Sequence, residues 1–138
     1  MSAEKSRAEA GRWLAQAEAD IGAARNSRKA ANFEWSCFQC QQAGEKALKA
    51  LWLFEGHEPW GHSLTRLIED YPDARRKAEL RRMIDQARLL DKLYIPTRYP
   101  NGLPDLTPAE VYAEPDAASA LSAARVLLEA VKAVARPQ

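Results

Sequence analysis

The stretch Phe33–Gly56, FEWSCFQCQQAGEKALKALWLFEG, decides the fold of this chain. It contains no proline, and small or apolar residues recur about every 3.5 positions, the period of one helix face packed against another helix. These residues are Cys37, Cys40, Gly44, Ala47, Leu48 and Leu51. Because glycine lowers helix propensity by about 1 kcal/mol relative to alanine, Gly44 indicates a closely approaching neighbour. The pattern predicts a helix over 33–55, ended by Gly56.

A second helical pattern precedes this stretch. Ser6 and Glu9 have the spacing of a capping box, in which each side chain accepts a hydrogen bond from the other residue's backbone N–H. An apolar stripe begins at Trp13 and recurs at helical spacing. We therefore expect a helix from Ser6 to about Ser27, followed by a short polar turn in which Asn32 caps the next helix.

Further helices are expected after the stretch. A short one covers 63–70, and a longer one begins at Pro72-Asp73. Four prolines make 96–108 an extended loop, which ends in a single capped turn over 107–110. The last helix covers about 116–136. Its expected buried stripe is Ala117, Leu121, Ala124, Leu128 and Val131.

The fold class follows from these patterns. No segment shows the alternation of apolar and polar residues that marks a β-strand. The sequence therefore predicts an all-α protein, an up-and-down bundle of four main helices with one or two short extra helices. At 138 residues, with 46% hydrophobic and 28% charged residues, the chain has the size and composition of a single domain, 1–138.

Charge and composition exclude several classes of protein. Twenty basic residues against nineteen acidic ones leave a formal charge of +1, which argues against a protein that holds nucleic acid by bulk charge. No apolar run approaches the roughly 18 residues that span a bilayer, and the start has no apolar signal-peptide segment. With two cysteines there is no disulfide framework, so we expect a cytoplasmic protein that does not act at a membrane.

The spacing of Cys37 and Cys40, followed by His57 and His62, resembles a zinc site. The helical residues 41–56 separate the two pairs by roughly 25 Å. Metal bonds of about 2 Å cannot close that gap within one chain. We therefore interpret the cysteines as small core residues and expect no metal and no cofactor.

A polar row runs along the predicted helix over 33–55. Gln41, Glu45 and Lys49 are four residues apart and therefore share one face. One interpretation is a solvated face with a Glu45–Lys49 ion pair worth about 0.3–0.5 kcal/mol. The other is a polar cluster inside a groove, because Gln41 lies near Cys37 and Gly44 at the border of the small-residue seam.

The segment YIPTRYP, 94–100, holds Arg98 between prolines and tyrosines. An arginine on such a rigid platform suits a phosphate or a nucleobase. The alternative is an aromatic loop that covers the end of the bundle while Arg98 caps helix carbonyls.

Three strings together resemble HEPN domains (higher eukaryote and prokaryote nucleotide-binding). They are RWLAQAEADIGAAR at 12–25, the stretch 33–56 followed by GHSL at 61–64, and LYIPTRYPNGLP at 93–104. The resemblance covers about 12–134, and it extends both to stand-alone prokaryotic members and to the HEPN domain of the chaperone sacsin. It implies an all-α bundle that usually dimerises, with a cleft associated with nucleotide or RNA.

The resemblance also implies a test for catalysis. Many HEPN domains are metal-independent ribonucleases, whose motif is an arginine followed by a histidine after four to six intervening residues. After Arg98 these positions hold Leu103, Pro104 and Asp105, and no arginine stands at that spacing before His57 or His62. The nuclease pair is absent from this sequence, so we expect no catalytic residues.

The leading hypothesis is therefore a non-catalytic, nucleotide-associated HEPN module with Gln41, Glu45, Lys49 and Arg98 in its pocket. A second hypothesis is an interaction partner, of toxin–antitoxin type, for a separately encoded minimal nucleotidyltransferase. A third is an atypical metal-independent RNase that uses His62 as base with Arg98, which keeps RNA as a candidate ligand.

A homodimer is expected as well. Four aromatic residues on the helix over 33–55 exceed what one helix face needs for its own core. They are Trp35, Phe38, Trp52 and Phe54.

Overall fold

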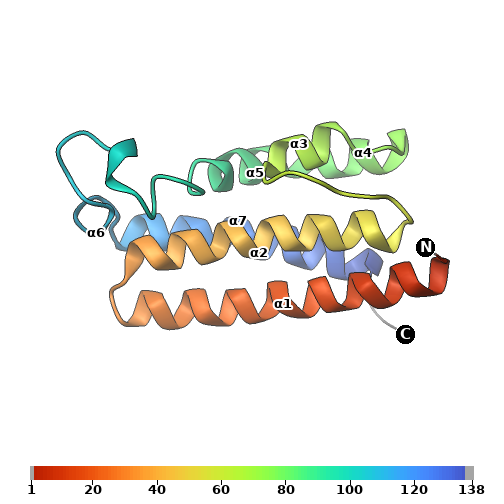
Figure 1. Cartoon of the computed structure of the whole chain (residues 1–138), viewed down its shortest axis with the longest axis horizontal. Coiled ribbons are helices and arrows are strands. Elements are labelled where there is room, and N and C mark those ends of the chain that lie inside the picture. Colours follow the sequence, from red (N-terminus) through yellow and green to blue (C-terminus); the bar gives the residue numbers. More distant parts are fainter. Residues whose placement is uncertain (1, 136–138) are drawn as a thin grey trace.

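Helix α2 (Phe33–Phe54) lies at the centre of the molecule and forms almost where the sequence predicts it. The computed structural model describes residues 2–135. Helix α1 (Ala3–Lys29) packs antiparallel to α2, and α7 (Glu114–Ala135) packs beside α2 (Figure 1). Gly56 ends the α2 segment with a φ of +83°, a left-handed conformation that glycine adopts without a steric penalty.

A layer of short helices covers the side of α2 opposite α1. They are α3 (Leu64–Glu69), α4 (Ala74–Leu80), a 3₁₀ turn (Arg81–Met83) and α5 (Ile84–Asp91). The side chain of Ser63 caps α3 and that of Asp73 caps α4, each by accepting a backbone N–H. The predicted long helix after Pro72 is therefore present but is interrupted by the 3₁₀ turn.

The proline-rich loop leads from α5 to α7. It contains a 3₁₀ turn (Pro100–Gly102) and the short helix α6 (Pro108–Val111). Thr107 and Glu110 form the predicted capping box, since each side chain accepts from the other residue's backbone N–H. The loop and α6 lie over one end of the bundle (Figure 1).

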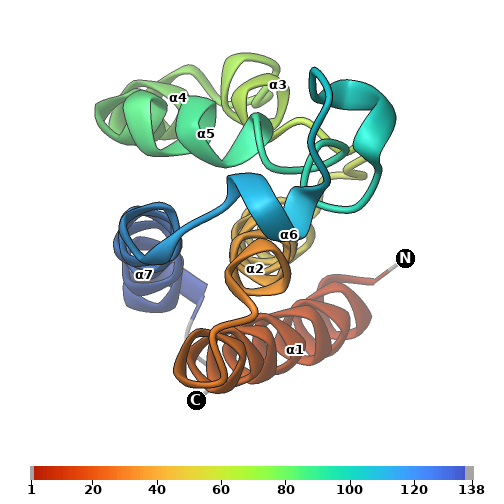
Figure 2. The same cartoon turned by 90° about the vertical axis from the view of Figure 1, so that its left-hand side faces the viewer.

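The predicted fold class is confirmed. Seen along the bundle, α1 forms one layer, α2 and α7 the next, and α3 to α5 the third (Figure 2). The main helices α1, α2, α4 with α5, and α7 run alternately up and down, and α3 and α6 are the short extras. Residues 2–135 contain no β-strand, and no helix in that range is long and apolar enough to span a membrane.

The start of the first helix differs from the prediction. Ser2 is the N-cap, because its side chain accepts from the backbone N–H of Lys5. Ser6 therefore lies one turn inside α1 and is buried, while the Glu9 side chain bonds Arg12 and Trp13 instead of a backbone group. A capping-box spacing inside a helix that begins earlier caused the error. The expected end of the last helix at position 136 lies outside the described residues.

Gly44 has the close neighbours that its place in the seam predicts. A Cβ atom at this position would lie 2.6 Å from Leu64 Cδ2, 2.8 Å from Leu90 Cδ1 and 3.3 Å from Leu127 Cδ1. These leucines come from α3, α5 and α7, so three helices converge on one residue of α2. The expected buried stripe of α7 is likewise confirmed.

Candidate functional site

The polar row of α2 is buried, so its interpretation as a solvated face is wrong. Gln41 is fully buried, Glu45 is 6% exposed and Lys49 is 8% exposed. Gln41 Nε2 donates to Glu45 Oε1 at 3.1 Å, and Lys49 Nζ donates to Glu45 Oε2 at 3.1 Å. The structure thus brings three of the four predicted site residues into direct contact.

His62 completes this group, which we call the Glu45 cluster (Gln41, Glu45, Lys49 and His62). It lies in the loop after α2, where Gly61 turns the chain with a φ of +85°. His62 Nδ1 is 3.3 Å from Glu45 Oε2. Because an ionised carboxylate can only accept, Nδ1 carries the hydrogen, and Nε2 of the neutral ring is left as an acceptor. The His62 side chain is 61% exposed, so this acceptor can meet a ligand.

Gln41 holds the cluster in place. Its Oε1 accepts from Gln42 Nε2 at 2.8 Å, and its Nε2 also lies 3.5 Å from the carbonyl oxygen of His62. Every polar atom of the Gln41 amide therefore has a partner inside the protein. The fully buried Gln41 amide thus makes its hydrogen bonds to Glu45, Gln42 and the His62 loop.

Arg98 belongs to an aromatic stack (Phe38, Tyr94 and Arg98) that adjoins the Glu45 cluster. The His62 ring stacks on Tyr94 with a centroid separation of 5.0 Å and an interplanar angle of 21°. Arg98 Cζ lies 4.8 Å from the centroid of the same Tyr94 ring and 4.2 Å from that of Phe38. His62 and Arg98 are therefore neighbours of one tyrosine ring within a single chain.

Two of the three guanidinium nitrogens of Arg98 already donate hydrogen bonds within the protein. Nε and Nη2 donate to the carbonyl oxygen of Tyr94 at 2.9 and 2.8 Å. The alternative interpretation expected helix carbonyls, whereas this acceptor belongs to the loop after α5, which ends at Asp91. Within residues 2–135 no hydrogen bond engages Nη1, so one amino group is left for an anion.

Lys49 closes the other end of the cluster. Its ammonium lies 5.7 Å from the centroid of the Trp13 ring, and Trp13 Nε1 donates to Glu9. The cluster and the adjoining stack together hold the carboxylate of Glu45 against the ammonium of Lys49 and the guanidinium of Arg98. The balance of charge is positive, which suits an anionic ligand.

A cavity of about 320 Å³ opens beside His62 and is called here the Trp60 cavity. Its lining includes Trp52, Trp60, His62, Arg66 and Asp70. Trp60 is 83% exposed, and the Arg66 side chain makes no hydrogen bond or ion pair with the rest of the described chain. Neither residue is among the site residues predicted from the sequence. A tryptophan between Pro59 and Gly61, where no helix can bury it, was the available signal.

The other histidine and the cysteines lie elsewhere. The His57 ring packs edge-on against Trp52 and Tyr71, at centroid separations of 6.2 and 5.5 Å. Cys37 and Cys40 are fully buried, and burial raises the pKa of each thiol to about 12. The uninterrupted helix between the cysteine and histidine pairs is confirmed. Within the described part of the chain, no three His, Cys, Asp or Glu side chains gather closely enough to hold a metal ion.

The helical bundle, with the buried polar row of α2, places this chain among small all-α domains. The model of the HEPN domain family matches residues 10–134. The chain belongs to the HEPN domain family. No curated protein matches it.

Solved structures agree with this assignment. The chain is 37% identical to TT1696 from Thermus thermophilus, with a TM-score of 0.83, covering 90% of this chain and 96% of the other. It is 35% identical to ST0689, an archaeal HEPN homologue, with a TM-score of 0.77 and coverages of 92% and 98%. An HEPN domain protein of Thermotoga maritima, tm0613, is 24% identical over 89% of this chain and 96% of the other. Its TM-score of 0.65 shows a shared fold alone.

Proposed function

We propose that this HEPN domain is a non-catalytic module that binds a nucleotide at the Glu45 cluster and the adjoining Trp60 cavity. One observation carries the proposal. His62 is anchored to Glu45, stacked on Tyr94 beside Arg98, and exposed at the edge of the cavity that holds Trp60.

The chemistry of a nucleotide matches the groups available there. A phosphate prefers charge-assisted donors, which Arg66 and Nη1 of Arg98 supply. A nucleobase prefers an aromatic face, and the 83% exposed Trp60 offers one. Lys49 and Glu45 act behind these groups, because their ion pair fixes the position of His62.

The same geometry argues against catalysis. Metal-independent RNA cleavage needs one group to accept the 2′-OH proton and another to protonate the leaving oxygen, tasks that imidazole performs well near pH 7. Only His62 is placed for either task, since His57 packs against Trp52 and Tyr71. Lys49 is held in the buried ion pair with Glu45 and is no substitute.

Isothermal titration of the full chain with ATP, GTP and the corresponding monophosphates tests the proposal. Trp60→Ala, Arg98→Ala and His62→Ala should each weaken the tightest of these ligands by about tenfold or more. Arg12→Ala is the matched control, because the Arg12 side chain is 80% exposed on α1 and outside the site. Absence of binding at about 1 mM nucleotide, or equal loss in the control, would refute the proposal.

A second candidate function is an atypical metal-independent RNase. Glu45 Oε2 lies 3.3 Å from His62 Nδ1. This contact favours the RNase function, because a carboxylate in that position orients an imidazole that acts as a catalytic base. Structured and unstructured RNA should be incubated with the chain in EDTA. Cleavage that is lost in both His62→Gln and Arg98→Ala would establish this function and exclude the non-catalytic one.

We also propose that the chain forms a homodimer. Of the four aromatic residues on which the sequence-based expectation rests, one supports this proposal. Trp52 is 7% exposed and donates to the carbonyl oxygen of Leu67, so it belongs to the chain's own core. Phe38 and Phe54 are covered by Arg98 and Arg7. Trp35 is 49% exposed and supports the dimer. Light scattering should give twice the 15.4 kDa chain mass for the wild type and a lower mass for Trp35→Ser.

A further inference from the structure

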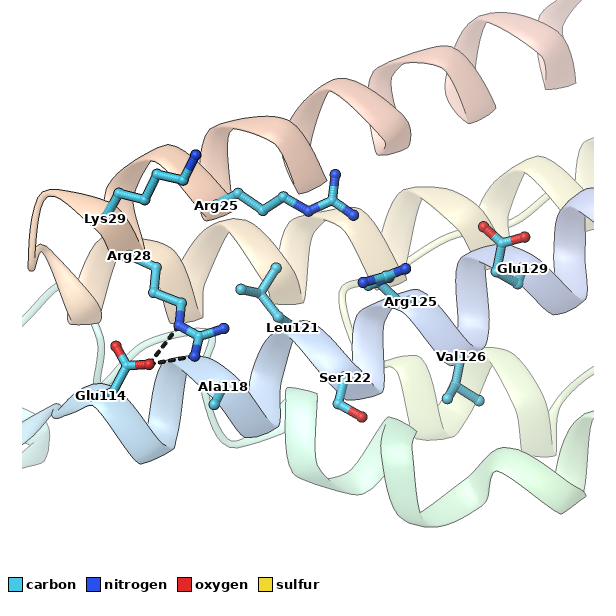
Figure 3. A pocket seen from close by; sticks show the side chains of 10 residues that line it. All are labelled: Arg25, Arg28, Lys29, Glu114, Ala118, Leu121, Ser122, Arg125, Val126 and Glu129. Carbon is cyan, nitrogen blue, oxygen red and sulfur yellow. Dashed lines mark hydrogen bonds and ion pairs between the residues drawn. The ribbon is translucent and has the colours of Figure 1, made fainter.

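A groove of about 850 Å³ lies between the carboxyl-terminal end of α1 and the outer face of α7 (Figure 3). We call it the α1–α7 groove. Arg25, Arg28 and Lys29 line it from α1, and residues between Glu114 and Glu129 line it from α7. It shares no lining residue with the Glu45 cluster or the Trp60 cavity, so it is a separate site.

The groove carries unpaired positive charge on both walls. Arg25 and Arg125 place their guanidinium groups in the space between the two helices (Figure 3). Neither of them, nor Lys29, makes a hydrogen bond or ion pair with another side chain of residues 2–135.

The acidic residues of the groove are outnumbered, because its lining holds four basic residues and two acidic ones. Glu114 accepts a hydrogen bond from Arg28 Nε at 2.6 Å, and Glu129 lies 3.8 Å from Lys132. The charge that a ligand would meet is therefore positive.

The apolar residues that line the groove lie on α7. Leu121 is packed into the core on the row of α7 that faces α1, and Val126 is 41% exposed on the neighbouring row, which points away from α1 (Figure 3). From Glu114 to Glu129 the α7 wall extends about 22 Å, the length of about four helical turns. A charged row that runs beside a row of small and apolar residues matches the two faces of an amphipathic helix.

We propose that the α1–α7 groove docks an acidic amphipathic helix of a partner protein. Aspartate or glutamate on one edge of that helix would pair with Arg25 and Arg125, and its aliphatic stripe beside them would cover Val126. Bidentate pairing with a carboxylate is the geometry that a guanidinium favours. Among the lining residues there is no aromatic side chain, so a single-stranded nucleic acid would find no stacking platform there.

A synthetic peptide provides the probe. It has about 15 residues, enough for about 22 Å of helix, with a leucine stripe beside a row of glutamates and a fluorescent label. Fluorescence anisotropy with the full chain should show binding that weakens about tenfold or more in the double variant Arg25→Glu, Arg125→Glu and in Val126→Asp. Arg82→Glu is the matched control, because Arg82 is exposed and unpaired within the described chain but lies in the 3₁₀ turn after α4, outside the groove.

A peptide of opposite charge makes the test more specific. A peptide with lysine in place of each glutamate should bind the double variant more tightly than the wild type, a result that simple loss of structure cannot give. The proposal is overturned if the glutamate peptide fails to bind at about 1 mM. It is overturned equally if Arg82→Glu weakens binding as much as the double variant does.

Two further measurements exclude other occupants. A labelled single-stranded RNA that binds more tightly than the peptide, with the same loss in the double variant, would overturn the proposal in favour of a nucleic-acid groove. A homodimer that Val126→Asp dissociates would overturn it in favour of a second copy of this chain. Unchanged dimer mass and RNA binding in both variants support the partner helix.

Discussion

Helices α1 and α2 are both long, yet the protein surrounds them very differently. Six of the 27 residues of α1 are buried, whereas 14 of the 22 residues of α2 are buried. α1 lies on the outside of the bundle and contacts it along one stripe, while α2 is packed against α1, α7 and the layer of short helices (Figure 2). The same kind of interaction should therefore have different energies on the two helices.

Burial also explains where the candidate site lies. A polar side chain on α1 can turn to water, but on α2 it must find a partner inside the protein. Glu45 therefore accepts from Gln41, Lys49 and His62. The most enclosed helix of the bundle therefore carries polar side chains that bond one another.

The largest expected effect compares an ion pair on each helix. Glu45→Ala leaves Lys49, whose side chain is 10% exposed, as a buried charge without its carboxylate. The free energy of unfolding should fall by about 3 kcal/mol. Arg12→Ala breaks the pair with Glu9 on α1, where Arg12 is 80% exposed. This variant should change the free energy of unfolding by less than about 0.5 kcal/mol. Urea denaturation measures both, and equal losses would contradict the comparison.

A glycine on each helix gives the next effect. Gly44→Ala forces three leucine side chains to move and should destabilise the protein by about 1–3 kcal/mol, despite the better helix propensity of alanine. Gly22→Ala on α1 meets no atom within 4 Å and should stabilise it by about 0.5–1 kcal/mol. Thermal melting of the two variants should therefore shift in opposite directions. A stabilised Gly44→Ala protein would show that the centre of the bundle is looser than described.

A smaller effect is expected at the end of α2, where Glu55 is partly exposed. Burial raises the pKa of Glu55, but hydrogen bonds from Arg76 and Tyr71 and the charge of Arg76 outweigh burial and lower it below the ordinary value of 4.5. The ionised carboxylate therefore stabilises the fold above pH 4.5, and this contribution is lost as the pH falls through the lowered pKa.

The matching variant is Glu55→Gln. It should lower the free energy of unfolding at neutral pH by about 1–2 kcal/mol, and the difference from the wild type should shrink in acid. Unfolding curves recorded at neutral pH and well below pH 4.5 measure this. A difference independent of pH would mean that the carboxylate charge is not what stabilises this end of α2.

The smallest effect concerns the thiols of α2 and requires no substitution. With each pKa raised to about 12, Cys37 and Cys40 carry almost no thiolate at neutral pH. Ellman's reagent should not react with the native protein and should titrate both thiols in denaturant. Metal analysis should find no stoichiometric zinc, since a cysteine binds zinc only as a thiolate. Rapid native reaction or one bound zinc per chain would contradict the buried positions of these residues.

Local patterns in the sequence predicted the bundle because helix periodicity, proline and capping residues act over a few neighbouring positions. α2, its close contact at Gly44 and the Thr107 capping box followed from such patterns. Ser6 was misread because a four-residue motif does not show whether a helix has already begun.

The candidate site was only partly accessible to the same reasoning. Gln41, Glu45 and Lys49 share one helix, so their spacing alone placed them together. The stacking of His62 on Tyr94 joins residues from two loops, and no local pattern encodes that contact. The place of Trp60 in the lining of its cavity likewise depends on how the loop after α2 lies against α3.

The walls of the α1–α7 groove come from opposite ends of the sequence, and the pair between Arg28 and Glu114 joins positions 86 residues apart. Such a surface exists only after α7 has docked on the rest of the bundle. A molecule bound there would contact both the first and the last helix and hold them together. By mass action it would raise the melting temperature with its own concentration, so the lifetime of the domain would depend on the supply of its partner.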